Sequence, residues 1–437
     1  MLTEYFWVLS SVLLLVVQIL VLIRVCRNLH LGFFNPLVVY LGVWITVYML
    51  YVGNFVSFNE VNPKTWIALM SGHIMFTVGG LHSIIYSHHA FGARSQVTGD
   101  SVFALTAKKY VYGKWMSIFF LLGLGVFSLY VSDVLSQYGS LSEVLLAPWV
   151  IRAGIGELEI GHSYKFIYLM MPLSVISSLY LLFNRRNIVA WVILFAALFS
   201  TIATTGRSNF VWCVIWISFA FMYGWRINKL TPKMLFGTTF VLILSLTTFV
   251  IMGFWLGKSI ENQTSFRDYG TYGNFLVLPY VYLEGGIPAF QAHLEEGETK
   301  KFGRNSFLPL VKLYKFLKNE PAPSEIEEFV DIPFPFNTST YLLPAFQDFG
   351  LLGVVVMPFI YGFGAMLCFS YMWYCEQNLF MIFLSSLITS VIVFSFGSNK
   401  MVSFATWMFV LVGYIFFLMV NNRHFRSSVG RSGSYAE

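Results

Sequence analysis

Residues 5–23 read YFWVLSSVLLLVVQILVLI, an apolar run that contains no charged side chain. A segment needs about twenty such residues to cross the hydrocarbon core of a bilayer as a helix. Comparable runs recur along the chain, at 36–53, 66–86, 111–132, 165–183, 188–204, 209–225, 235–256, 350–372, 379–396 and 403–420. Irregular backbone cannot face lipid, so each run predicts a helix. The chain is therefore expected to be an all-α polytopic membrane protein with about eleven transmembrane helices.

The composition supports lipid as the main solvent. Of the 437 residues, 57% are hydrophobic and only 11% are charged, whereas a soluble protein carries about 25% charged residues. The net charge of +6 does not indicate a nucleic-acid partner, because the basic residues lie between the apolar runs and form no recognition motif. No nucleotide or dinucleotide fingerprint occurs. The histidines near the third run lack convergent carboxylates or thiols, so neither a cofactor nor a metal is expected.

The basic residues also predict the orientation, because loops rich in Lys and Arg stay in the cytoplasm. One set of short loops and the tail holds fourteen of them: Arg24, Arg27, Arg94, Lys108, Lys109, Lys114, Arg185, Arg186, Arg226, Lys229, Lys233, Arg423, Arg426 and Arg431. The opposite short loops hold five: Lys64, Arg152, Lys165, Arg207 and Lys400. This asymmetry puts the amino terminus outside and the carboxyl terminus inside.

Four regions follow from this topology. Residues 1–256 carry the first eight spans, 257–349 form one large outer loop, 350–420 carry the last three spans, and 421–437 form a cytoplasmic tail. A loop as long as 257–349 is usually functional. Within it, the apolar stretch 274–294 predicts a helix at the membrane interface, and the Pro-rich stretch 321–336 predicts an extended connection.

Ionisable residues are nearly absent from the middle of the runs and gather at the outer face, where chemistry is therefore expected. Arg207 follows Gly206 in the turn between two spans, ahead of Ser208 and Asn209, which can cap the next helix. A helix amino terminus beside an arginine makes an anion site. The alternative is a polar hairpin turn whose arginine extends to lipid headgroups.

Other candidates lie in the long outer loop. Arg267 and Arg304 are either a clamp on phosphate oxygens, which suits the planar guanidinium, or part of a solvated surface. Asp348 precedes a span and is either its N-cap or the group that holds a catalytic arginine or a substrate hydroxyl. His293 has the pKa range of a general base, although loop histidines are more often structural.

The order of several motifs resembles the O-antigen polymerases, also called oligosaccharide repeat-unit polymerases. The turn reads Ala203-Thr204-Thr205-Gly206-Arg207-Ser208-Asn209-Phe210, and the segment that opens the ninth span reads Ala345-Phe346-Gln347-Asp348-Phe349-Gly350-Leu351-Leu352-Gly353. Between them, Tyr280-Val281-Tyr282-Leu283-Glu284-Gly285-Gly286-Ile287 is similar to the tyrosine- and glycine-containing loop helix of that family. The resemblance covers residues 188–400.

This resemblance implies a metal-independent C-type glycosyltransferase of the bacterial inner membrane, with 257–349 periplasmic. It would polymerise oligosaccharide repeat units carried on undecaprenyl pyrophosphate, for O-antigen or capsule-type polysaccharide and lipopolysaccharide, with a chain-length regulator as partner. By the same resemblance Arg207 would be the strongest pyrophosphate ligand, with Arg267 and Arg304 next and Asp348 and Tyr282 as support residues. Together with the chemistry of the residues themselves, this predicts Arg207, Asp348 and His293 as catalytic and Arg267, Arg304 and Tyr282 as substrate-binding. The alternatives are an O-antigen ligase and a flippase or transporter for the same lipid-linked sugar.

Overall fold

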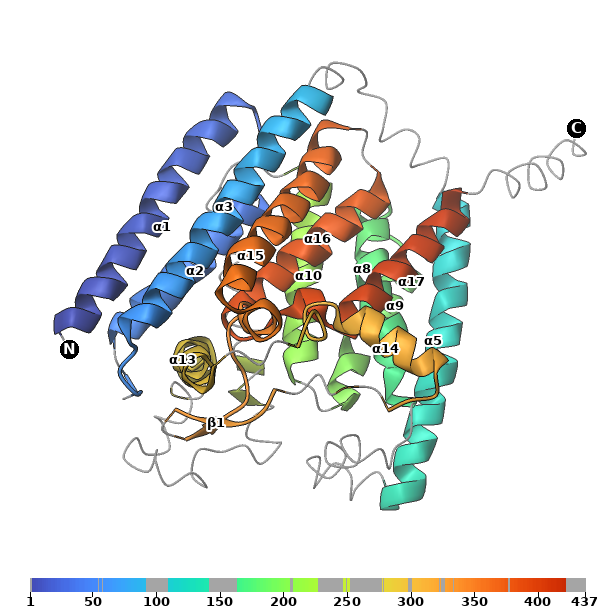
Figure 1. Cartoon of the computed structure of the whole chain (residues 1–437). Helices are drawn as coiled ribbons and strands as arrows, with labels where there is room; N and C mark the ends of the chain where they lie inside the picture. The colour runs from blue at the N-terminus through green and yellow to red at the C-terminus, as the bar shows by residue number, and fades with distance from the viewer. Residues whose placement is uncertain are drawn as a thin grey trace, which may run out of the picture.

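Long apolar helices dominate the computed structural model of the chain (Figure 1). The structure describes residues 2–53, 55–56, 58–91, 109–140, 163–204, 207–226, 247–248, 250–251, 277, 279–297, 301–321, 323, 327–332, 334–375 and 378–421. Within these ranges eight helices are long and apolar enough to cross a membrane. They are α1 (Leu2–Asn28), α2 (Pro36–Gly53), α3 (Pro63–Phe91), α5 (Lys109–Tyr138), α8 (Ile167–Phe183, after the 3-10 turn η2, Ser163–Phe166), α15 (Leu343–Tyr374), α16 (Leu379–Val393) and α17 (Phe404–Asn421).

Two further predicted spans form shorter apolar helices. They are α9 (Ile188–Ser200), extended by the 3-10 turn η3 (Thr201–Thr204), and α10 (Arg207–Gly224). The predicted span 235–256 falls almost entirely outside the described residues. The prediction of an all-α, multi-pass architecture is confirmed at this level, and the total of eleven spans stays a prediction.

The bundle is held most closely between α3 and α15, where two glycines let the backbones touch. A Cβ atom at Gly79 would collide with the carbonyl oxygen of Phe359, and one at Gly362 would collide with the carbonyl oxygen of Phe76. Small residues at such crossings are typical of helix pairs in membranes, where close van der Waals packing replaces the hydrophobic effect.

A second contact, between α10 and α16, uses hydroxyl groups. The indole N–H of Trp212 donates to Ser390 Oγ at 2.9 Å, and that of Trp216 donates to Ser386 Oγ at 3.1 Å. About two turns further along α10, the hydroxyls of Tyr223 and Thr389 lie 2.8 Å apart. Because lipid supplies no hydrogen-bond partners, each of these polar groups stabilises the pair by meeting its partner across the helix interface.

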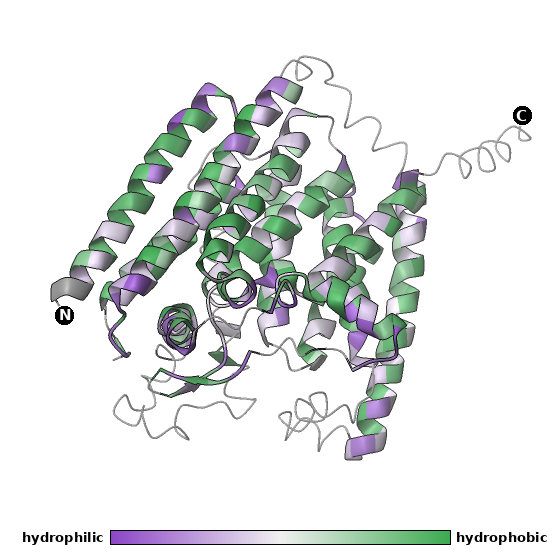
Figure 2. Ribbon diagram, viewed as in Figure 1, coloured by the Kyte–Doolittle hydropathy of each residue, from purple (hydrophilic) through white to green (hydrophobic). Residues whose placement is uncertain are grey.

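Several of the basic short loops lie together at one end of the bundle. The guanidinium of Arg185 lies over the ring of Trp225, and that of Arg226 lies over Trp373. Trp373 in turn donates from its indole N–H to the carbonyl of His30. The carboxyl end of α17 points to this end of the bundle, whereas the amino terminus of α1 lies at the opposite end (Figure 1). Figure 2 shows the hydrophilic residues concentrated at the helix ends and the hydrophobic residues along their lengths.

The end that holds the amino terminus is covered by short elements. These are α13 (Gly286–Glu296), α14 (Leu308–Leu317), the strands β1 (Val330–Asp331) and β2 (Pro335–Phe336), and the 3-10 turns η6 (Phe394–Phe396) and η7 (Lys400–Val402) (Figure 1). The antiparallel strands pair Val330 with Phe336 and Asp331 with Pro335.

Two expectations for this region are corrected by the structure. The predicted interfacial helix at 274–294 corresponds to α13, but most of α13 is buried against protein, where it packs on α3 and on β1. The Pro-rich stretch 321–336 includes the small hairpin, and side chains of that hairpin, Val330 and Phe336, are buried in a second apolar cluster. Protein, and not lipid, therefore covers the apolar face of α13.

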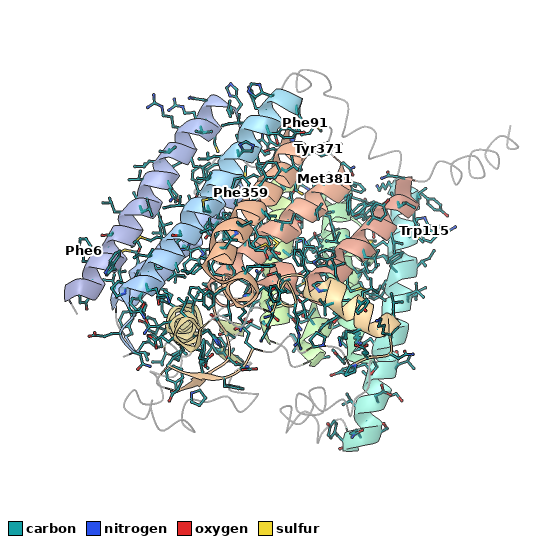
Figure 3. The ribbon with its side chains drawn as sticks, viewed as in Figure 1. Phe6, Phe91, Trp115, Phe359, Tyr371 and Met381 are labelled. Carbon is teal, nitrogen blue, oxygen red and sulfur yellow. The ribbon has the colours of Figure 1, made fainter. Side chains whose placement is uncertain are left out.

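Large apolar side chains point away from the bundle along its length. Figure 3 shows Phe6 projecting from the outer face of α1, where 63% of its surface is exposed. A soluble protein rarely exposes such a continuous apolar surface. This surface fits the hydrocarbon core of a bilayer.

Candidate functional site

A chain of hydrogen-bonded aromatic residues lies inside the bundle, near the end covered by α13. The hydroxyls of Tyr40 and Tyr48, both on α2, lie 2.6 Å from Nδ1 and Nε2 of His73 on α3. The Tyr40 hydroxyl also lies 2.7 Å from that of Tyr341, just before α15. All four residues are buried. A buried imidazole with both nitrogens bonded is stable in apolar surroundings, so this network links three segments firmly.

A small pocket adjoins this network. Its lining includes Tyr40, Tyr341, Tyr361, Asn399 and Lys400, and its free space is roughly that of one water molecule. The pocket therefore joins the buried tyrosines to the loop between α16 and α17.

This loop is fixed by Asn399. Its side-chain amide donates to the carbonyl of Tyr341 at 2.9 Å and to the Tyr361 hydroxyl at 3.3 Å. The oxygen of the same amide accepts from the backbone N–H of Met401 and so begins η7. The next residue, Lys400, places its ammonium group 5.7 Å from the ring centre of Trp212.

Glu284 is the least expected residue of the region. Its side chain is fully buried, and neither carboxylate oxygen has a hydrogen-bond partner. Burial raises the pKa of this carboxyl well above its usual range, because an apolar environment disfavours the charged form. Glu284 lies within electrostatic range of the Tyr48 hydroxyl, at one end of the aromatic network.

Two glycines explain how Glu284 comes to lie there. A Cβ atom at Gly286 would collide with the carbonyl oxygen of Phe396, and one at Gly285 would press on the ring of Phe336. Only glycine lets the start of α13 approach the η6 turn and the hairpin this closely. The Glu-Gly-Gly sequence therefore carries the carboxyl into the protein.

More polar groups without partners lie on the segment that passes Gly286, two residues after Glu284; a Cβ atom at Gly286 would lie 3.6 Å from the carbonyl carbon of Ser339. The hydroxyls of Thr338, Ser339 and Thr340 are inaccessible and unbonded, as is Oε2 of Glu327. Glu327 bonds the backbone of Ser339, and Lys400 lies within electrostatic range of it. Burial raises the pKa of Glu327 to about 8, although Lys400 acts in the opposite direction.

We call Glu284, Glu327, Ser339, Thr340, Asn399 and Lys400 the end cluster. Buried polar groups in folded proteins are normally paired, so several unpaired ones in one place call for an explanation. A ligand with many hydroxyl groups would satisfy them, because carboxyl and hydroxyl groups both accept and donate hydrogen bonds. Lys400 adds a cation that can meet a negatively charged group.

Asp348, one of the predicted catalytic residues, has a different role in the structure. It is buried, and its carboxylate accepts the backbone N–H of Asn305 at 3.0 and 3.1 Å and that of Ser306 at 2.5 Å. The N-cap interpretation is wrong, because the carboxylate accepts from the loop at 305–306, and the backbone of α15 leaves the helical conformation at Gly350, two residues further on. Asp348 instead holds the loop that leads into α14, and Arg304 lies in that loop with its side chain exposed.

The other predicted site residues lie apart from this contact. Arg207 is the first residue of α10, so Ser208 and Asn209 lie inside the helix and do not cap it from outside. The Arg207 side chain and all of Arg267 lie outside the described residues. His293 is buried in α13 and bonds Glu296 at 3.1 Å. Tyr282 is half-buried and packs against the ring of Phe336.

Among the predicted site residues whose side chains the structure describes, Tyr282 lies two positions before Glu284, with its carbonyl near Gly397. In the ranges that the structure describes, no group of three or more His, Cys, Asp and Glu side chains could hold a metal ion. The end cluster offers carboxyl, hydroxyl and ammonium groups to a ligand.

Sequence reasoning missed most of the end cluster. One signal was present: Glu284 is the only charged residue in the apolar stretch 274–294, and an ionisable residue in such a stretch indicates a functional site. Lys400 was interpreted only as a topology signal. No local pattern marks the hydroxyls of residues 338–340, whose burial depends on distant segments.

Comparisons of the whole chain with known proteins do not identify a family. No protein-family model, no curated protein and no solved structure matches the chain.

Proposed function

We propose that this protein is a membrane glycosyltransferase that polymerises oligosaccharide repeat units carried on undecaprenyl pyrophosphate. The end of the bundle that carries α13 and the end cluster would face the periplasm of a bacterial inner membrane. The charge asymmetry of the short loops supports this orientation. The order of the Gly206-Arg207 turn, the loop helix and the Asp348 segment supports the reaction class.

The observation that carries the proposal is the unpaired, fully buried carboxyl of Glu284, two residues before the point where α13 approaches the segment with the unpaired hydroxyls of residues 338–340. In glycosyl transfer, a hydroxyl oxygen of the acceptor forms a bond to the anomeric carbon of the donor. The bond from that carbon to the pyrophosphate oxygen breaks, and its electron pair leaves with the pyrophosphate. The hydroxyl proton must pass to a base.

Glu284 is suited to be this base. Burial favours its protonated form, so it must first lose that proton; its carboxylate is then a stronger proton acceptor than an ordinary carboxylate. Lys400, in the same cluster, and Arg207, at the amino terminus of α10, would stabilise the charge that develops on the leaving pyrophosphate. Glu327 and Ser339 would hold hydroxyl groups of the incoming sugar. Opening of the small pocket would be needed to admit the sugar, since it now has room for about one water molecule.

The test is polymer formation by the purified protein in lipid nanodiscs, supplied with one repeat unit on undecaprenyl pyrophosphate. The expected product is a ladder of chain lengths that remain on the lipid pyrophosphate, with release of undecaprenyl pyrophosphate. Glu284→Gln should reduce polymer formation by about 100-fold or more, the range of general-base catalysis. Glu328→Gln, which alters an exposed carboxyl nearby, should leave it unchanged.

Three results would contradict the proposal. Normal ladders from Glu284→Gln would remove the observation that carries it. Transfer of the glycan only when a lipid A core is supplied would identify a ligase, and movement of the lipid-linked unit across the membrane without chain growth would identify a flippase.

A further inference from the structure

The short helix α14 has its apolar face turned away from the protein. Leu310, Leu313, Tyr314 and Leu317 follow the i, i+3, i+4, i+7 spacing of one helix face, and each is between 49% and 73% exposed. Only Leu308 and Pro309, at the beginning of the helix, are buried. A helix on the surface of a soluble protein has the opposite arrangement, with its apolar face against the core.

The surroundings of α14 show what covers this face. The helix packs on α17 and crosses it in the lower part of the bundle (Figure 1). On α17, Trp407 and Leu411 are also about half exposed, on a helix that is long and apolar enough to cross the membrane. The apolar face of α14 therefore continues a surface that meets acyl chains. A helix with this composition lies in the plane of the membrane.

Lysine side chains border the apolar face. Lys312 and Lys315 are half-buried, and Lys315 forms an ion pair with Glu320. Lys312 lies within electrostatic range of Lys165, which precedes α8 in the chain by two residues. A phosphate can accept hydrogen bonds from two ammonium groups that lie near each other. Lysines at the level of the headgroups attract anionic lipids.

The position of α14 is set by the rest of the protein. The loop before it turns sharply, with positive φ at Phe302 and Gly303. Its backbone N–H groups at Asn305 and Ser306 are held by Asp348, at the start of α15. The helix is therefore attached to the bundle at a fixed height, and it does not depend on lipid to define its place.

We propose that α14 is an in-plane membrane helix whose Leu310–Leu317 face lies among acyl chains, and that Lys165 and Lys312 together bind the phosphodiester of an anionic phospholipid. This inference does not depend on the proposed glycosyltransferase activity. It gives the outer loop an attachment to the same leaflet that would hold a lipid-linked substrate.

The depth of α14 is measured with spin labels in nanodiscs that contain phosphatidylcholine and phosphatidylglycerol. Single cysteines replace Leu313, Leu317 or Glu320, the last as an exposed control, in a protein whose native cysteines are replaced by alanine. Labels at 313 and 317 should collide with oxygen more than with a water-soluble nickel chelate, and the label at 320 should show the reverse. Equal access of the nickel chelate to 313, 317 and 320 would overturn the in-plane position.

The lipid site is tested by native mass spectrometry of detergent-purified protein titrated with phosphatidylglycerol or phosphatidylcholine. Lys312→Gln and Lys165→Gln should each weaken retention of phosphatidylglycerol about fivefold, since a lysine near the membrane surface contributes about 1 kcal/mol. Lys318→Gln, whose ammonium lies 4.7 Å over the Tyr314 ring, should leave retention unchanged.

Retention of phosphatidylcholine should be the same in all these proteins. Equal loss of both lipids in Lys312→Gln would overturn the phosphodiester contact, because it would show that only packing had changed. Displacement of phosphatidylglycerol by inorganic phosphate alone would also overturn it, because the site would then bind a free anion and not a lipid.

Discussion

Replacement of Asp348 by alanine should release the loop before α14. The buried carboxylate accepts two backbone N–H groups, those of Asn305 and Ser306. A buried donor left without a partner costs about 1–3 kcal/mol. Two such donors make the local cost about 2–6 kcal/mol. Asparagine keeps one carbonyl oxygen and should cost about 1–2 kcal/mol, because it loses one acceptor and the charge.

The assay is hydrogen exchange of the peptide that covers residues 301–318, in nanodiscs. If the loop opens locally, a cost of about 2–6 kcal/mol raises its exchange rate by roughly 30-fold to roughly 20,000-fold. Asp348→Asn should give a smaller rise in the same peptide. Asp331→Ala, which alters an exposed aspartate in the hairpin, serves as the matched control and should leave the peptide protected.

The comparison of Asp348→Ala with Asp348→Asn also distinguishes a residue that only holds the loop in place from a catalytic group. If Asp348 only holds the loop, polymer formation should fall in proportion to the loss of protection from exchange, so that Asn is milder than Ala in both measurements. Unchanged protection of residues 301–318 in Asp348→Ala would refute the argument from these hydrogen bonds. A fully inactive Asp348→Asn protein with normal protection would return Asp348 to the catalytic residues.

Three further predictions concern packing, pH and the predicted anion site. Gly362→Ala should lower the stability of the protein by about 1–3 kcal/mol because α3 has no room for a methyl group, whereas Gly364→Ala, which meets open space, should not; thermal unfolding measures both. The folded protein holds a proton on Glu327 up to about pH 8, but the unfolded chain releases it near pH 4.5, so stability should fall as pH rises through that window. Glu327→Gln should flatten this fall in an unfolding series against pH. Arg207→Ala should reduce polymer formation roughly 30- to 1000-fold and Arg207→Lys less, because lysine keeps the charge without the two-point contact; wild-type ladders from Ala would remove Arg207 from the site.

Much of the fold could be predicted from residues close together in the chain. The apolar runs became helices because a hydrocarbon solvent requires every backbone polar group to bond within its own segment. The boundaries of short elements were less predictable, as α10 shows by beginning at Arg207, ahead of its expected caps. The prediction for α13 placed a helix correctly but gave it the wrong neighbour, since periodicity does not reveal whether protein or lipid covers an apolar face.

The candidate site depended on pairs of residues that are remote in sequence. The hydroxyls of Tyr40 and Tyr341 meet although 301 positions separate them, and Asp348 bonds a backbone N–H 43 positions earlier. The carboxyl of Glu284 is buried only because Gly286 lets α13 approach the loop after α16. Hydropathy and charge alone therefore determined that this chain crosses a membrane repeatedly and which loops are basic, since both depend on the transfer of local segments out of water. Which polar groups lie together without partners was decided by tertiary packing, because hydrogen bonding and burial depend on what every other segment places beside each residue.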